Sequence, residues 1–115
     1  MESNQAIKAL SALAQDSRLA IFRLLIQRGP RGLSVGKIAE HLDIAAATLS
    51  FHLKELSIAG LLASRQEGRF VIYSANFAAM NDLIGFLTTN CCGGNPCVAT
   101  PAYAPDTTVT PMENS

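Results

Sequence analysis

The sequence lacks tryptophan and is poor in other aromatic residues, with two Tyr and five Phe among 115 residues. Hydrophobic residues nevertheless make up 49% of the chain, which is enough for folding. This length supports a single domain. Its core must therefore consist mostly of Leu, Ile, Val and Ala, which suits packed helices.

Long hydrophobic runs are also absent. No apolar stretch approaches the roughly 18–20 residues that span a bilayer. Residues 1–5 lack the basic region that precedes the apolar segment of a signal peptide. We therefore expect a cytoplasmic protein without membrane contact.

Neither sign of charge is in excess, because nine Lys and Arg balance nine Asp and Glu. The basic residues all lie between Lys8 and Arg69, so residues 1–90 carry a net charge of +2 and residues 91–115 one of −2. This weak basic bias permits DNA binding through local patches but does not by itself indicate it.

The first 90 residues contain no cysteine, and the three cysteines, Cys91, Cys92 and Cys97, fall within seven residues. In a reducing cytoplasm such a cluster is more typical of a soft-metal or redox site than of a structural disulfide.

Apolar residues recur at helical spacing over most of the first 90 residues. Together with cap and breaker residues, this spacing predicts five helices, over residues 6–15, from Asp16-Ser17 to Gly29-Pro30, from Ser34 to Leu42, over 46–58 and over 77–89.

The period changes after the fourth helix. Residues 61–66 and 69–75 are predicted as short strands, with a hairpin turn at Glu67-Gly68. The order α-α-α-α-β-β-α, with a three-residue turn before the fourth helix, predicts a mainly α, winged helix-turn-helix fold. We expect a domain over residues 1–90, a cysteine segment over 91–97 and a flexible Pro- and Thr-rich tail over 98–115.

In a helix-turn-helix the second helix enters the major groove at its N-terminal end. Small residues allow close approach, hydroxyls donate to bases or phosphates, and cations neutralise phosphate. From this helix and the wing, the predicted DNA-binding residues are Ala46, Thr48, Ser50, Phe51, His52, Lys54, Arg65 and Arg69. Three alternatives remain open: Thr48 and Ser50 could be surface or capping groups, Lys54 and Glu55 could form a solvated face, and His52 could be a packed, hydrogen-bonded histidine.

The two terminal helices carry more apolar surface than one small domain needs. A symmetric homodimer would bury it. Two recognition helices would then lie about one DNA turn apart, on double-stranded operator DNA with an inverted repeat.

A specific resemblance rests on SFHLKEL at 50–56, AGLL at 59–62 and RQEGR at 65–69. With these motifs, residues 6–90 resemble the ArsR/SmtB family of metal-responsive bacterial repressors. The resemblance implies a homodimer that binds operator DNA and releases it when a metal or metalloid binds. Two sensor sites common in that family are absent, since residues 33–36 contain no cysteine and residues 77–89 no histidine.

The segment from Asn90 to Cys97 resembles the C-terminal cysteine cluster of an arsenic-sensing branch of that family. As(III) is soft and takes three sulfurs, which Cys91, Cys92 and Cys97 can supply, whereas zinc prefers four ligands. We therefore predict a repressor induced by As(III), with no organic cofactor. Antimonite, Sb(III), or methylarsenite could replace arsenite.

Other interpretations of the same residues remain. Cys97 could form a redox-switched disulfide with Cys91 or Cys92, or the cysteines could be incidental. A thiol-dependent arsenate reductase is disfavoured, because residues 90–115 contain no Lys or Arg to activate a nucleophile. A winged helix used only for protein contacts is the last alternative. We predict a DNA-binding repressor rather than an enzyme.

Overall fold

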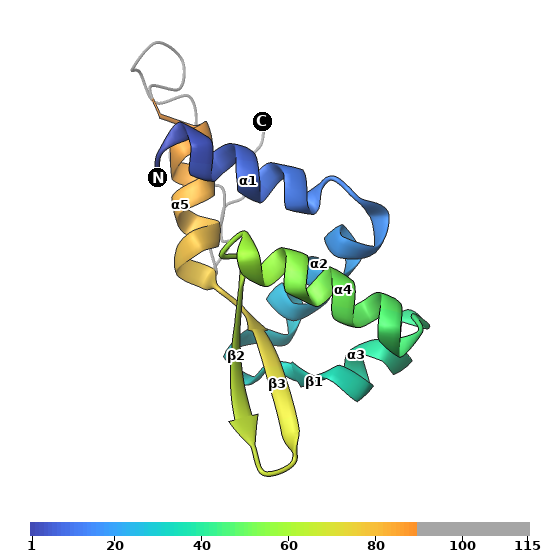
Figure 1. The fold of residues 1–115 in the computed structure, drawn as a ribbon. Coiled ribbons are helices and arrows are strands. Elements are labelled where there is room, and N and C mark those ends of the chain that lie inside the picture. The colour runs from blue at the N-terminus through green and yellow to red at the C-terminus, as the bar shows by residue number, and fades with distance from the viewer. Residues whose placement is uncertain (90–115) are drawn as a thin grey trace, which may run out of the picture.

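The computed structural model describes residues 1–89. The predicted cysteine segment 91–97 and the predicted tail 98–115 lie outside the described residues. Within them the elements follow one another along the chain (Figure 1), as α1 (Ser3–Leu13), α2 (Asp16–Arg28), η1 (Gly29–Arg31), β1 (Leu33–Ser34), α3 (Val35–Leu42), α4 (Ala46–Ile58), β2 (Leu62–Glu67), β3 (Phe70–Ala75) and α5 (Phe77–Leu87). The predicted winged helix-turn-helix fold is confirmed.

Local signals set most helix ends. Ser34 caps α3 as predicted, because its hydroxyl accepts a hydrogen bond from the backbone N–H of Lys37 at 3.3 Å. The start of α2 differs: the Gln15 side chain accepts from the N–H of Arg18 at 2.9 Å. Asp16 is therefore the first helical residue and not the predicted cap, and its charge there suits the helix dipole.

The sheet has three antiparallel strands in the order β1-β3-β2. The short strand β1 was not predicted, since two residues are too few to show an alternating pattern. It places Leu33 opposite Tyr73 and Ser34 opposite Ile72. This pairing holds the turn before β1 against the wing.

The hairpin turn lies one residue later than predicted. Glu67 pairs with Phe70, so the two turn residues are Gly68 and Arg69 rather than Glu67 and Gly68. The shift matters for function because it puts Arg69 at the tip of the wing instead of at the start of a strand.

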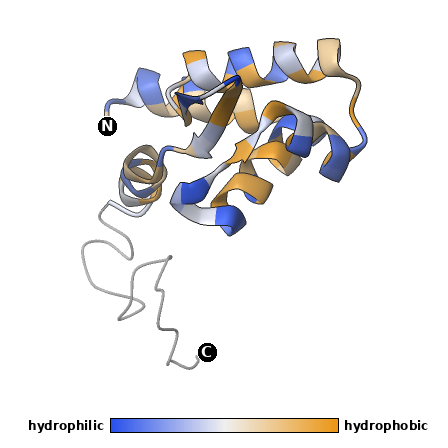
Figure 2. Ribbon diagram, turned by 90° about the horizontal axis from the view of Figure 1, so that it is seen from below, coloured by the Kyte–Doolittle hydropathy of each residue, from blue (hydrophilic) through white to orange (hydrophobic). Residues whose placement is uncertain are grey.

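The core is aliphatic, as the composition predicts. The largest fully buried side chains come from α2, α3, α4 and the segment after it, and are Ile21, Leu25, Ile38, Leu49, Leu53, Leu56 and Leu61. Hydrophobic and hydrophilic residues alternate along the helices (Figure 2), as expected of amphipathic helices packed around one core.

Candidate nucleic-acid interface

The helix-turn-helix consists of α3, a turn over residues 43–45, and α4. Asp43 ends α3 in the left-handed conformation, at φ 53° and ψ 51°, which Asp tolerates better than most residues. The backbone N–H of Ile44 donates to the carbonyl of Ala39 at 3.2 Å. No side chain of the described residues caps α4 at Ala45, so the N–H groups of its first turn are suited to donate to a phosphate.

One side of α4 is buried and the other is open to solvent. Leu49, Leu53 and Leu56 are no more than 2% exposed, and they fix the helix on the core. Five of the predicted DNA contacts lie on the exposed side, namely Ala46, Thr48, Ser50, Phe51 and Lys54. Their exposure makes them available to a DNA groove, and as DNA contacts they stay predictions.

The remaining predicted residue of α4, His52, lies elsewhere. Its side chain is only 7% exposed, and Nη1 of Arg18 lies 3.4 Å from its Nδ1. Phe51 packs against its ring at a centroid distance of 5.6 Å. His52 is therefore a packed, hydrogen-bonded histidine and not part of the DNA-facing surface, which corrects our prediction in favour of its alternative.

The two wing arginines have different environments. The guanidinium of Arg65 donates to Oε2 of Glu67 and to the carbonyls of Pro30 and Arg31. Arg69 at the tip is exposed and makes no hydrogen bond or ion pair with any residue between 1 and 89. Of the two, Arg69 is the more available to phosphate.

Phe70 was missed as a surface residue. It follows Arg69 and is 62% exposed, whereas the sequence predicted an ordinary strand residue at this position. The hydrophobicity of Phe70 favoured a buried position. Only the register of the hairpin, in which Phe70 pairs with Glu67, shows that it lies next to the wing tip.

Comparisons with known proteins agree with this geometry. Residues 13–65 match the sequence profile of a family described as a helix-turn-helix domain. The chain is 41% identical over 70 residues to YceK of Bacillus subtilis, an uncharacterized HTH-type transcriptional regulator, covering 59% of this chain and 69% of YceK. An ArsR-like transcriptional regulator from Rhodococcus sp. RHA1 has a similar structure, with a TM-score of 0.65 at 26% identity over 73% of this chain and 76% of that chain.

This chain belongs to the ArsR-type winged helix-turn-helix transcriptional regulators. It is a regulator and not an enzyme. The homodimeric winged helix-turn-helix domain of Mb0332 from Mycobacterium bovis, a possible ArsR-family regulator, is also similar, with a TM-score of 0.60 at 27% identity over 80% of this chain and 85% of that chain.

The ArsR-type regulator has an exposed apolar face on its terminal helices. Ile7 and Leu10 of α1 are 61% and 42% exposed, and Phe86 and Leu87 of α5 are 36% and 57% exposed. The two helices contact each other and lie at the end of the molecule remote from the wing tip (Figure 1). An apolar groove of about 430 Å³ lies between α2 and α5, and Leu13 of α1 also lines it.

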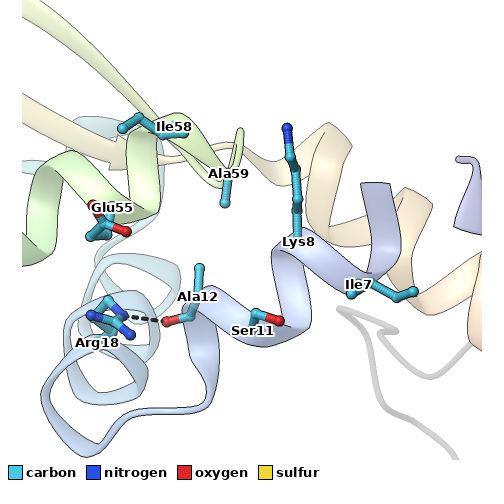
Figure 3. A pocket seen from close by; sticks show the side chains of 8 residues that line it. All are labelled: Ile7, Lys8, Ser11, Ala12, Arg18, Glu55, Ile58 and Ala59. Atoms are coloured by element: carbon cyan, nitrogen blue, oxygen red, sulfur yellow. Dashed lines mark hydrogen bonds between the residues drawn. The ribbon is translucent and has the colours of Figure 1, made fainter. Parts of the chain in front are cut away.

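A second pocket of the regulator lies between α1 and the end of α4 (Figure 3), with a volume of about 360 Å³. At its edge Nε of Arg18 donates to the carbonyl of Ala12 at 2.6 Å. The same guanidinium approaches His52, so one side chain connects the C-terminal end of α1 with the recognition helix.

Two kinds of feature are absent from residues 1–89. This part of the regulator has no helix long and apolar enough to cross a membrane. It also contains no group of three or more His, Cys, Asp or Glu side chains placed to hold a metal ion.

Proposed function

We propose that this regulator is a repressor that binds an inverted-repeat operator as a homodimer and releases it when As(III) binds to Cys91, Cys92 and Cys97. The observation that carries the DNA-binding part is the two-sided α4 helix. Its leucines are fully buried while its small, hydroxyl and Lys side chains are exposed. A helix of this kind can enter the major groove without unpacking the core.

Dimerisation is supported by the apolar face of α1 and α5. Four large side chains are exposed there, and a helix surface of this kind is stabilised by covering it. A twofold dimer covers it with the same surface of a second copy. The homodimeric state of the Mb0332 domain supports this arrangement.

The inducer site is assigned to the thiols for two reasons. Residues 1–90 contain no cysteine, and the described part of the chain has no candidate metal cluster. Arsenite, As(OH)₃, can react with three thiols to give As(SR)₃ and three waters, so the three cysteines would supply its full complement of soft ligands.

The position of the thiols in the sequence gives the coupling a physical basis. Cys91 follows the end of α5 at Leu87 by four residues, and α5 carries part of the apolar face. Binding at the thiols would thereby act on the helix that we assign to the dimer. A coupling of about 1–3 kcal/mol is sufficient for release.

The decisive experiment follows the anisotropy of a labelled duplex from the region upstream of the regulator's own gene. Purified regulator is added until the duplex is bound, and As(III) is then titrated. We expect release by As(III), and little or no release for Cys91→Ser, Cys92→Ser and Cys97→Ser. Asn95→Ser is the matched control, since it changes the same segment, keeps all three thiols and should respond like the wild type.

Each contrary outcome has a clear meaning. Failure of the wild type to bind the duplex would contradict the operator assignment for that region. Binding without release by As(III), or release that survives all three serine variants, would refute the metalloid assignment. Release by hydrogen peroxide instead, with loss of two alkylatable thiols per chain, would favour the redox switch, in which two thiols give a disulfide and peroxide is reduced to water.

A further inference from the structure

We infer that Arg65 is a positioning residue that fixes the wing, and that Arg69 is the cation of the wing that contacts phosphate. This inference rests on the proposed DNA-binding function. It differs from the simpler expectation that both wing arginines contact DNA.

The first support is the contacts of Arg65. Nε lies 2.6 Å from Oε2 of Glu67, Nη1 lies 3.3 Å from the carbonyl oxygen of Pro30, and Nη2 lies 2.7 Å from that of Arg31. All three guanidinium nitrogens thus donate to oxygens of the protein. The planar, forked group suits such a set of acceptors, and a Lys ammonium could not reproduce it.

The second support is the place of these contacts in the sheet. Arg65 pairs with Ile72, and Ile72 also pairs with Ser34, the last residue of β1. Beyond this level the wing has only two strands, and an isolated two-stranded hairpin is marginally stable. Arg65 therefore connects β2 to the η1 turn at the level where support from the third strand ends.

The third support is the rigidity of the turn that accepts these hydrogen bonds. Gly32, directly after η1, lies so close to β3 that a Cβ there would be 2.3 Å from the carbonyl oxygen of Tyr73. The Pro30 and Arg31 carbonyls are thus part of a segment packed on the sheet. Through Arg65, the outer wing is attached to this segment.

The contact with Glu67 has an electrostatic consequence. Glu67 is two residues from Arg69, and its unpaired carboxylate would repel a phosphate at the wing tip. Its ion pair with Arg65 offsets that repulsion, although both side chains are partly exposed and the pair itself adds little stability. Arg69, without an acceptor in the described residues, keeps its full charge for phosphate.

The salt dependence of DNA binding tests the role of Arg69, and the affinity of charge-keeping variants tests that of Arg65. Each phosphate contact contributes about 0.9 to the slope of log K against log[salt], so two wings in a dimer contribute about 1.8. We expect Arg69→Met to reduce the slope by about this amount. Arg65→Met should weaken binding about fivefold or more, measured by anisotropy on the duplex from upstream of its own gene.

The lysine variants provide the matched control. Arg69→Lys keeps the charge and should bind like the wild type, whereas Arg65→Lys should lose about as much affinity as Arg65→Met, because the fork is lost. Wild-type affinity in Arg65→Met or in Arg65→Lys would overturn the assignment of Arg65, and an unchanged slope in Arg69→Met would overturn that of Arg69.

A measurement without DNA tests the position of the wing independently. Amide hydrogen exchange at Glu67 and Phe70 should accelerate in both Arg65 variants and stay unchanged in Arg69→Met, with the melting temperature checked for each protein. Unchanged exchange in the Arg65 variants refutes the positioning role. Absent DNA binding by the wild type would instead count against the proposed function, so the two failures are distinguishable.

Discussion

The turn between α2 and β1 offers a sharp test of how the wing is held. Gly32 has φ 68° and ψ −168°, a region that is essentially restricted to glycine. In Gly32→Ala the new Cβ would also lie 2.3 Å from the carbonyl oxygen of Tyr73 and 3.0 Å from Cγ2 of Ile72. Neither neighbour can withdraw easily, because Tyr73 pairs with Leu33 and Ile72 with Ser34.

Gly29 is a matched control for the backbone term. It has φ 82° and ψ −166°, nearly the same conformation, but a Cβ there would meet nothing within 4 Å. Gly29→Ala therefore measures conformational strain alone, about 2 kcal/mol. Gly32→Ala adds the overlap with β3, worth about another 2 kcal/mol, so its total loss should be about 4 kcal/mol.

Urea denaturation followed by circular dichroism measures both losses. With an m-value of about 1.5 kcal/mol per molar urea, the midpoint should fall by roughly 1.3 M for Gly29→Ala and roughly 2.7 M for Gly32→Ala. Protein concentration must be held constant, because the proposed dimerisation would make the midpoint depend on it. Equal losses in the two variants would refute the reasoning, since the contact with β3 would then contribute nothing.

Three further predictions concern α4 and the proposed dimer face. Phe51→Ala should weaken operator binding about tenfold. Replacing operator thymine by deoxyuracil should weaken binding by the wild type but not by this variant, because we expect the ring to pack on thymine methyl groups; an equal loss of affinity in the wild type and the variant would contradict this. His52→Ala should lower the free energy of unfolding in urea by about 2 kcal/mol, whereas a reduced salt slope would restore it as a phosphate contact. Leu87→Glu should give monomers in sedimentation velocity, while Phe70→Glu, which alters the similarly exposed wing residue, should stay dimeric.

Features with local signals were predictable from the sequence. The bounds of α4 at Ala46 and Ile58 and the cap at Ser34 agree with the structure, because helical period and side-chain capping act over a few residues. The hairpin was located to within one residue. Its register was not, since Glu67-Gly68 and Gly68-Arg69 are both acceptable turns and pairing across the strands decides between them.

His52 was predictable in hindsight from the helical period. It lies three residues after Leu49 and four before Leu56, so it falls on the same side of α4 as the buried leucines. Its polarity favoured an exposed position, but the guanidinium of Arg18 supplies a partner from 34 residues away in the chain. The environment of Arg65 was hidden for the same reason, since Pro30 and Arg31 approach it only in the folded chain.

Arg18 forms a physical link between the proposed dimer face and the recognition helix α4. Its Nε donates to the carbonyl of Ala12, in the last turn of α1, where helix carbonyls lack intrahelical donors. Its Nη1 lies 3.4 Å from Nδ1 of His52, a buried residue of α4. Ile7 and Leu10, on the exposed side of α1, belong to the face assigned to the partner subunit. We therefore expect a displacement of α1 by a partner subunit to alter the hydrogen bond of Arg18 to Ala12 and, through Arg18, its approach to His52 of α4.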